Sequence, residues 1–172
     1  MCEVALPNKE ISFVYSKEIL SQLESIMPRS AVTAIQEALY RMDRNALQKA
    51  LETFLLQTIS FHDAANEVFY HGLILGMCAV MDHRYRLTSN RESGDGRFDI
   101  QMLPLSKKLP GILIELKAEK DCSDERLKKL SEIALQQIND KKYDTELTAD
   151  GVKTIYKYGV AFSRKKVEVA VG

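Results

Sequence analysis

The sequence GRFDI at residues 96–100 is followed, after a short loop, by GILIELK at residues 111–117. Both stretches are predicted strands, and the second is a nearly continuous apolar run broken by Glu115 and Lys117. Side chains two residues apart on a strand point to the same face, so this carboxylate and ammonium share a face that is otherwise expected to be buried. Asp99 ends a similar apolar strand nearby. Because buried ionised groups are costly unless they are paired or bound to a metal, the three residues predict a site for a hard divalent cation.

The composition predicts a single soluble globular domain. The chain has 172 residues, of which 45% are hydrophobic and 28% charged, and a domain of this size buries roughly 70% of its unfolded surface. No apolar run approaches the ~20 residues that cross a bilayer, so no membrane partner is expected. No secretory signal is visible, because Glu3, Lys9 and Glu10 interrupt the N-terminal stretch. The net charge of zero argues against a nucleic-acid-coating surface, and leaves room for a local groove.

The cysteine and histidine residues exclude several other kinds of site. Cys2, Cys78 and Cys122 are odd in number and far apart, which predicts a reduced, cytoplasmic protein without a cysteine metal site. The three histidines are scattered, which argues against zinc. The chain also lacks a glycine-rich dinucleotide loop, a His-Glu-x-x-His motif, a Gly-x-Ser-x-Gly motif and EF-hand spacing.

Helices are expected in the first half of the chain. Apolar residues recur at helical spacing between residues 8 and 27, and Pro28 ends that pattern. We expect three further helices: Ser30 to about Met42, a helix capped by Asn45, and a helix from His62 or Asp63 to about Met81. The last of these is predicted to bury Val68, Leu73, Leu75 and Met77.

Strands dominate the second half. We expect strands at residues 85–88, 98–103 and 112–118, a helix capped by Ser123 or Asp124 that runs to about Lys142, a short helix near residues 151–156, and strands at 157–162 and 166–171. The order is helices followed by αβββαββ. We expect residues 1–60 to form a helical lead-in that packs on a core formed by residues 61–172.

The charged residues at the two central strands suit phosphodiester hydrolysis. This reaction needs an activated water and a group that absorbs charge on the phosphate, and Mg²⁺ with oxygen ligands supplies both. Asp99 and Glu115 offer carboxylate oxygens, and the backbone carbonyl of Leu116 can add a ligand. Lys117 would orient the nucleophilic water or neutralise charge on the phosphate.

These motifs resemble the PD-(D/E)XK nuclease superfamily, which places an acidic residue on one strand and Glu-x-Lys on the next strand of a hairpin, before a helix. The predicted αβββαβ order matches that superfamily's core. In more detail, the sequence over about residues 60–172 resembles the nuclease-like C-terminal domain of bacterial AAA-ATPase-like proteins, although the chain has no Walker A pattern. The stretches that carry this resemblance are Glu67 with Tyr70-His71, residues 96–99, residues 114–118, residues 134–138 and Lys141-Lys142-Tyr143. Residues 7–10 resemble the segment that joins that domain to the ATPase part.

The resemblance implies an α/β fold with a restriction-endonuclease-like core, in which helices flank a mixed central sheet. It implies a Mg²⁺- or Mn²⁺-dependent nuclease that hydrolyses the phosphodiester bonds of DNA. By position, Asp99 and Glu115 match the two metal carboxylates, and Lys117 matches the catalytic lysine. The motif's leading proline is replaced by Phe98.

Two further site residues follow from the resemblance. Glu67 matches the acidic residue that the first core helix contributes to the metal site. Gln137 matches a glutamine that some nuclease branches place near the active site, with Tyr143 as a companion.

Partners are also implied. Relatives of this core pair up or lie beside motor domains, which implies a homodimer or an AAA-ATPase-like partner or parent protein. The candidate contacts to DNA phosphates are Arg84, Arg86, Arg91 and Arg97. A second basic cluster, residues 164–166, is expected to be a turn with solvated charges.

Other interpretations of the same residues stay open. Asp99, Glu115 and Lys117 could form a cross-strand ion pair on a surface hairpin, worth about 0–1 kcal/mol. Glu67 could be an acid favoured at a helix N-terminus, and Gln137 could bridge strands. The chain as a whole could be a catalytically silent nuclease-fold module that serves as a protein-interaction or DNA-binding scaffold, or a regulatory domain.

Overall fold

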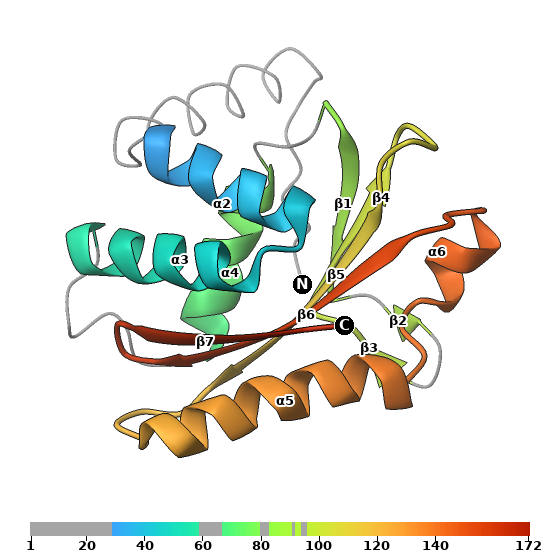
Figure 1. Ribbon diagram of the computed structural model, residues 1–172. Coiled ribbons are helices and arrows are strands. Elements are labelled where there is room, and N and C mark those ends of the chain that lie inside the picture. The colour runs from blue at the N-terminus through green and yellow to red at the C-terminus, as the bar shows by residue number, and fades with distance from the viewer. Residues whose placement is uncertain (1–28, 59–66, 80–82, 91, 94–95) are drawn as a thin grey trace, which may run out of the picture.

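The protein is a mixed α/β structure in which helices flank a five-stranded sheet, as the computed structural model in Figure 1 shows. The structure describes residues 29–58, 67–79, 83–90, 92–93 and 96–172. The predicted α/β class and its flanked mixed sheet are confirmed. The expected helix at residues 8–27 lies outside the described residues.

The sheet has the strand order β1-β4-β5-β6-β7. Its strands are β1 (Tyr85–Ser89), β4 (Ile100–Pro104), β5 (Gly111–Ala118), β6 (Ile155–Ser163) and β7 (Lys166–Val171). Neighbouring strands are antiparallel except β5 and β6, which are parallel. Parallel neighbours need a long crossover, and this crossover contains α5 (Asp124–Asp140). A separate two-stranded ribbon, β2 (Glu92–Ser93) with β3 (Gly96–Arg97), lies in the predicted loop before β4.

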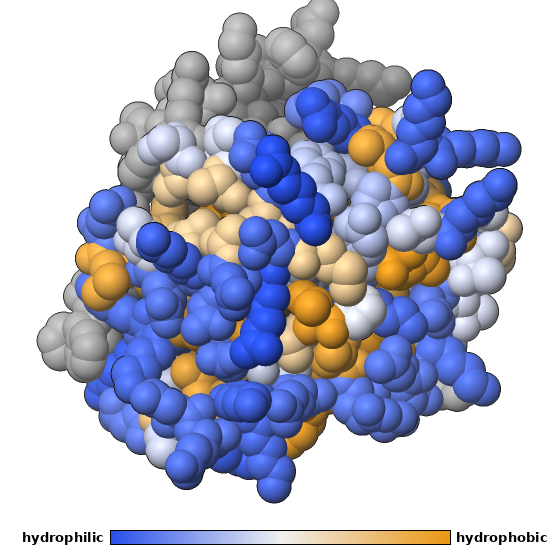
Figure 2. Space-filling view, in the orientation of Figure 1, coloured by the Kyte–Doolittle hydropathy of each residue, from blue (hydrophilic) through white to orange (hydrophobic). Residues whose placement is uncertain are grey.

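Helices cover both faces of the sheet. Figure 1 shows α2 (Arg29–Arg41), α3 (Arg44–Thr58) and α4 (Glu67–Ala79) on one face and α5 on the other. The short helix α6 (Thr145–Ala149) follows α5. Much of the outer surface in this orientation is hydrophilic (Figure 2). No helix in the described ranges is both long enough and apolar enough to span a membrane.

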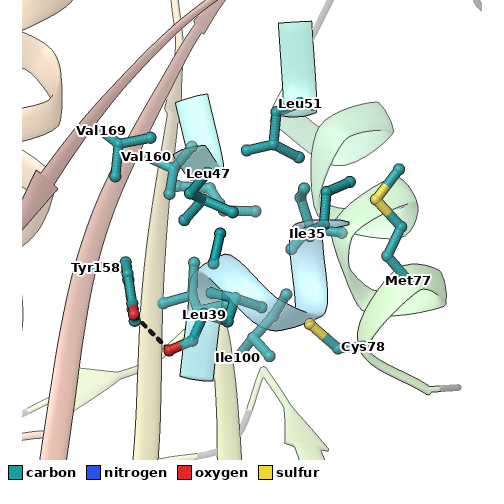
Figure 3. Close-up of a cluster of buried hydrophobic side chains, with 14 of the residues drawn as sticks. Ile35, Leu39, Leu47, Leu51, Met77, Cys78, Ile100, Tyr158, Val160 and Val169 are labelled. Carbon is teal, nitrogen blue, oxygen red and sulfur yellow. Dashed lines mark hydrogen bonds between the residues drawn. The ribbon is translucent and has the colours of Figure 1, made fainter. Parts of the chain in front are cut away.

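The main core lies between the sheet and helices α2, α3 and α4. Figure 3 shows how α2 and α3 place apolar side chains against the sheet, while α4 adds Met77 and Cys78. The fully buried Tyr158 of β6 donates its hydroxyl to the carbonyl of Leu39 at 2.7 Å, which joins α2 to the sheet by a hydrogen bond within this core. The described part of the predicted lead-in therefore packs on the sheet, and the domain boundary at residue 60 stays a prediction.

The alternation of side chains along β5 determines which residues face α5 on the opposite side from the main core. Ile112, Ile114 and Leu116 belong to the core with α2, α3 and α4, whereas Leu113 packs with the α5 residue Ile138. Because side chains alternate along a strand, the odd-numbered positions, including Glu115 and Lys117, face the α5 side. This strand is buried on both faces up to residue 116.

Several helix boundaries differ from the predictions. Ser123 caps α5 as expected, since its hydroxyl accepts from the Arg126 amide. Asn45 does not begin α3, because Asp43 takes the capping role and accepts from the Ala46 amide at 3.0 Å. The helix α5 ends at Asp140 with Lys141 as its C-cap, close to the predicted end at about Lys142.

Two further predictions about helices are wrong. The short helix lies at Thr145–Ala149, before Gly151, rather than at residues 151–156. Gly151 adopts a φ of 80°, which ends the helix and turns the chain toward β6. In α4, Val68 is 80% exposed, and the buried residues are Tyr70, Ile74, Met77 and Cys78. This helix carries apolar residues on most sides, so its periodicity does not identify the buried face.

Gly159→Ala is expected to destabilise the fold, because α5 packs directly on this glycine. A Cβ at Gly159 would lie 2.1 Å from the Ser131 carbonyl oxygen and 2.4 Å from the Leu135 amide nitrogen. Neither backbone group can move without shifting α5, so we expect a loss of about 3 kcal/mol in the free energy of unfolding, measured by urea denaturation. Gly72→Ala is the matched control, since a Cβ there meets no atom within 4 Å. Equal stability of the two variants would contradict the argument.

Candidate active site

A hydrogen bond joins the side chain of Asp99 to the backbone of β5. Asp99 lies just before β4, and its Oδ2 accepts a hydrogen bond from the Leu116 amide at 2.8 Å. Leu116 is the residue between Glu115 and Lys117, so the carboxylate of Asp99 meets the strand where the charged pair lies. The structure therefore brings together the three residues that the sequence singled out.

Glu115 is a buried carboxylate with only part of its hydrogen-bonding capacity used. It is 2% exposed. Its Oε1 accepts from the Lys117 ammonium at 3.1 Å and from the Gln137 side-chain amide of α5. Its Oε2 is buried and has no hydrogen-bond partner within the described part of the chain. A buried polar atom without a partner is rare and expensive, so this oxygen is free to bind a cation.

Ionisation of both Asp99 and Glu115 is unfavourable without a cation, because Glu115 is buried and the two negative charges repel each other. Burial, and after it the nearby charge of Asp99, raise the pKa of Glu115 to about 7, while Lys117 and the Asp99 backbone act in the opposite direction. A cation between the two carboxylates would favour the ionised form of Glu115. The surface-hairpin interpretation is wrong for Glu115, because its carboxylate is buried.

Gln137 and Tyr143 extend the network. The Gln137 amide nitrogen lies 3.3 Å from the Tyr143 hydroxyl and also donates to Glu115. Tyr143 is 2% exposed and packs edge-on against Phe98, with ring centroids 6.3 Å apart. Phe98 replaces the motif's proline, and here its ring fixes the position of Tyr143. The structure thus brings Gln137 to Glu115, as the resemblance implied, and includes Tyr143.

His71 of α4 reaches the backbone beside Asp99 from another element. Its Nε2 lies 3.2 Å from the Asp99 carbonyl oxygen, 3.1 Å from the Ser89 hydroxyl and 3.4 Å from the Asn90 side-chain amide. The backbone amide of Asn90 donates to the Asp99 carbonyl at 3.1 Å. The positions of Ser89 and Asn90 beside the site were not predicted from the sequence. Asn90 is the residue that could have indicated a turn here, because asparagine tolerates the left-handed φ of 52° found there.

Glu67 is placed apart from the carboxylate pair. It is exposed in the first turn of α4. The described residues contain no group of three or more His, Cys, Asp or Glu side chains that could hold a metal ion. Glu67 therefore does not form such a group with Asp99 and Glu115, and its metal role stays a prediction, as does that of the Leu116 carbonyl.

The predicted basic residues do not form one cluster of free charges. Arg84 stacks over the Tyr40 ring at 5.3 Å, and Arg86 lies 3.9 Å from Asp150. Arg97 is exposed, and Arg91 lies outside the described residues. The cluster at residues 164–166 is the turn between β6 and β7, as expected. Its ion pairs are Arg164 with Asp121 and Lys166 with Asp124.

A comparison with protein families gives one match. The model of the PD-(D/E)XK nuclease superfamily matches residues 65–171, which is more than half of the chain. The match includes every candidate site residue from Glu67 to Tyr143. No curated protein matches the chain.

We expect the metal-free protein to lose stability as the pH rises, because Glu115 binds its proton more tightly in the folded state. The pKa rises from 4.5 to about 7, so this contribution is complete below about pH 4.5 and is lost as the pH passes 7. A shift of this size corresponds to about 3 kcal/mol at most. Urea denaturation in EDTA at pH 5 and pH 8 measures the difference.

Glu115→Gln should remove most of this pH dependence, since the variant has no proton to lose. Glu132→Gln, at an exposed position of α5, is the matched control and should keep it. The same pH dependence in both variants would show that another group is responsible.

Proposed function

This chain belongs to the PD-(D/E)XK nuclease superfamily, and we propose that it is a metal-dependent nuclease that hydrolyses phosphodiester bonds of DNA. The observation that carries the proposal is the contact of Asp99 with the backbone of β5 between Glu115 and Lys117. It brings the Asp99 carboxylate to β5 at the point where Glu115 and Lys117 lie. This donor set suits a cation and a phosphate together.

The residues present fit a hard divalent cation. Oε2 of Glu115, which has no hydrogen-bond partner among the described residues, and the carboxylate of Asp99 are oxygen donors, which Mg²⁺ and Mn²⁺ prefer. In the proposal these two carboxylates hold the ion, with the Leu116 carbonyl as a further ligand. A bound ion would polarise the phosphate and lower the pKa of water.

Lys117 is the proposed catalytic lysine. Its side chain is 24% exposed, and its ammonium lies 3.1 Å from Glu115 Oε1. The charge is therefore held at the edge of the buried site, where a phosphate can enter. An ammonium ~4 Å from a negative charge contributes up to about 4 kcal/mol at an effective dielectric constant of ~20, so it can stabilise charge that develops on the phosphate.

Gln137 is the proposed positioning residue for Glu115. Its amide donates to Oε1, which leaves Oε2 for the cation. Tyr143 contacts the same amide at 3.3 Å and restricts its orientation. A carboxylate held at one oxygen keeps its other oxygen in a defined place, which is the preorganisation that catalysis requires.

The protein partners stay predictions. A homodimer and an AAA-ATPase-like partner or parent protein are implied by the resemblance alone. The competing function is a scaffold that keeps the nuclease fold without catalysis. The buried Glu115 Oε2 has no partner in the part of the chain that the structure describes. This favours the nuclease, because a scaffold gains nothing from such a costly arrangement.

Lys117→Ala should abolish cleavage while the fold is kept. Labelled single-stranded, duplex and branched DNAs are incubated with each protein in Mg²⁺ and in Mn²⁺, with EDTA as a blank. We expect cleavage by the unaltered chain and a rate at least ~100-fold lower in the variant, since the stabilising charge is lost. Lys120→Ala, at a nearby exposed position, is the control and should cleave normally. Absence of metal-dependent cleavage by the unaltered chain would contradict the proposal.

Asp99→Asn should weaken Mn²⁺ binding and leave the structure intact. The asparagine oxygen can still accept from the Leu116 amide, but the negative charge is gone. We expect at least ~10-fold weaker binding by titration calorimetry, together with loss of cleavage. Asp140→Asn is the control, because this exposed carboxylate accepts from Gln136 away from the pair. Unchanged Mn²⁺ affinity in Asp99→Asn would exclude this carboxylate as a ligand.

A further inference from the structure

The C-terminal end of α5 lies beside the candidate site. Figure 1 shows this end next to the β2–β3 ribbon. A Cβ at Gly96 of β3 would lie 3.1 Å from the Tyr143 hydroxyl and 3.5 Å from Cδ of Lys141. Since Tyr143 contacts Gln137, and Gln137 contacts Glu115, Lys141 is close to the residues that position the buried carboxylate.

Two adjacent lysines at this end have uncompensated charges. Lys141 lies one helical turn after Gln137, on the same side of α5. Lys141 and Lys142 are exposed, and neither forms an ion pair with a described carboxylate. Of the neighbouring acids, Asp144 pairs with Lys157 at 2.7 Å, and Asp140 accepts a hydrogen bond from the neutral Gln136 amide at 2.7 Å and keeps its charge.

Many cations elsewhere on the surface are neutralised. The basic residues that pair with a carboxylate away from the site include Arg44, Arg126, Lys157, Arg164 and Lys166. The protein as a whole carries no net charge. Other exposed lysines, such as Lys107 and Lys108, also form no ion pair with a described carboxylate, and Lys141 and Lys142 differ from them by lying beside the site.

The backbone at Lys142 allows its side chain to be removed without strain. Lys142 has a φ of 52°, just after the α5 cap. Glycine is the usual residue at this position, because a Cβ is disfavoured in the left-handed region. Glycine at this position is therefore expected to remove the ammonium group without straining the backbone.

We propose that Lys141 and Lys142 bind backbone phosphates of the DNA strand that enters the Asp99–Glu115 site. This inference rests on the proposed function and names the surface that holds its substrate. Lysines bind phosphate as point charges without reading bases, so the contacts act on any sequence. Neutralising phosphates releases counterions, and the binding should therefore weaken steeply as salt increases.

The test uses the double variant Lys141→Ala/Lys142→Gly in the full chain. Lys107→Ala/Lys108→Ala is the matched control, since it removes two exposed adjacent lysines from the turn at the other end of β4 and β5. Both pairs are introduced into the Lys117→Ala protein, so that fluorescently labelled single-stranded and duplex DNA stays uncut. Fluorescence anisotropy then gives the affinity across a series of salt concentrations in Mg²⁺.

We expect the affinity of the test variant to fall about tenfold, and the slope of log K against log salt to fall by about two, one for each lost phosphate contact. The control should retain the slope of its parent. Affinity and slope equal to those of the control would overturn the proposal, as would absence of DNA binding by the parent. The same lysine dependence for labelled RNA with none for DNA would overturn the choice of DNA.

Stability separates this proposal from a purely structural role. Cations near a helix C-terminus also stabilise the helix dipole, and on that explanation the variant would lose stability without losing affinity. Lys142→Gly alone should keep or raise the urea midpoint, because glycine suits the positive φ, and should still weaken DNA binding. A lower midpoint with unchanged DNA affinity would overturn the proposal.

Cleavage kinetics distinguish a failure of the phosphate-binding proposal from a failure of the proposed nuclease function. In the chain with Lys117 intact, the double variant should raise KM and leave kcat unchanged, since it loses uniform binding of the substrate. If the unaltered chain binds DNA through these lysines and does not cut it, the nuclease proposal fails and the phosphate surface stands. If it cuts DNA with an unchanged KM in the variant, the phosphate surface alone fails.

Discussion

The contact between the α5 backbone and Gly159 positions the whole candidate site. Gly159 is the register partner of Glu115 across the parallel β5–β6 pair, and it leaves no room for a side chain beneath Ser131 and Leu135. With α5 pressed against β6 at this point, Gln137 reaches Glu115, and the helix shields that carboxylate from water. The burial that raises the pKa of Glu115 follows from this close packing.

The central strand β5 serves the core and the site at once. Its even-numbered residues from 112 to 116 pack against α2, α3 and α4, while Glu115 and Lys117 face the α5 side. Burying a carboxylate whose Oε2 has no described partner lowers stability. The apolar layer on the other face offsets that cost. A substitution in the core under β5 can therefore change the site without touching it, because both sets of side chains share one backbone.

Local patterns account for the parts of the structure that the sequence predicted. The alternation along residues 111–117 and the Glu115–Lys117 spacing depend on neighbouring residues alone, so the strand and its charged face were predictable. Gln137 came from the resemblance. The errors arose where two local signals compete, as with Asp43 and Asn45 near the start of α3. Gly159 and the contacts of His71 were not predictable, because they depend on elements that meet only in the folded chain.

The neutral composition and the proposed binding of a polyanion are compatible, because charge is distributed unevenly. Carboxylates neutralise cations in the β6–β7 turn and along α3, as with Arg164 and Arg44. At physiological ionic strength, charges separated by more than ~8 Å scarcely interact through solvent. A phosphate at the site would therefore respond to Lys117 and the nearby α5 lysines rather than to the net charge. Overall charge alone thus gives a poor basis for excluding nucleic-acid binding by a protein with a buried acidic site.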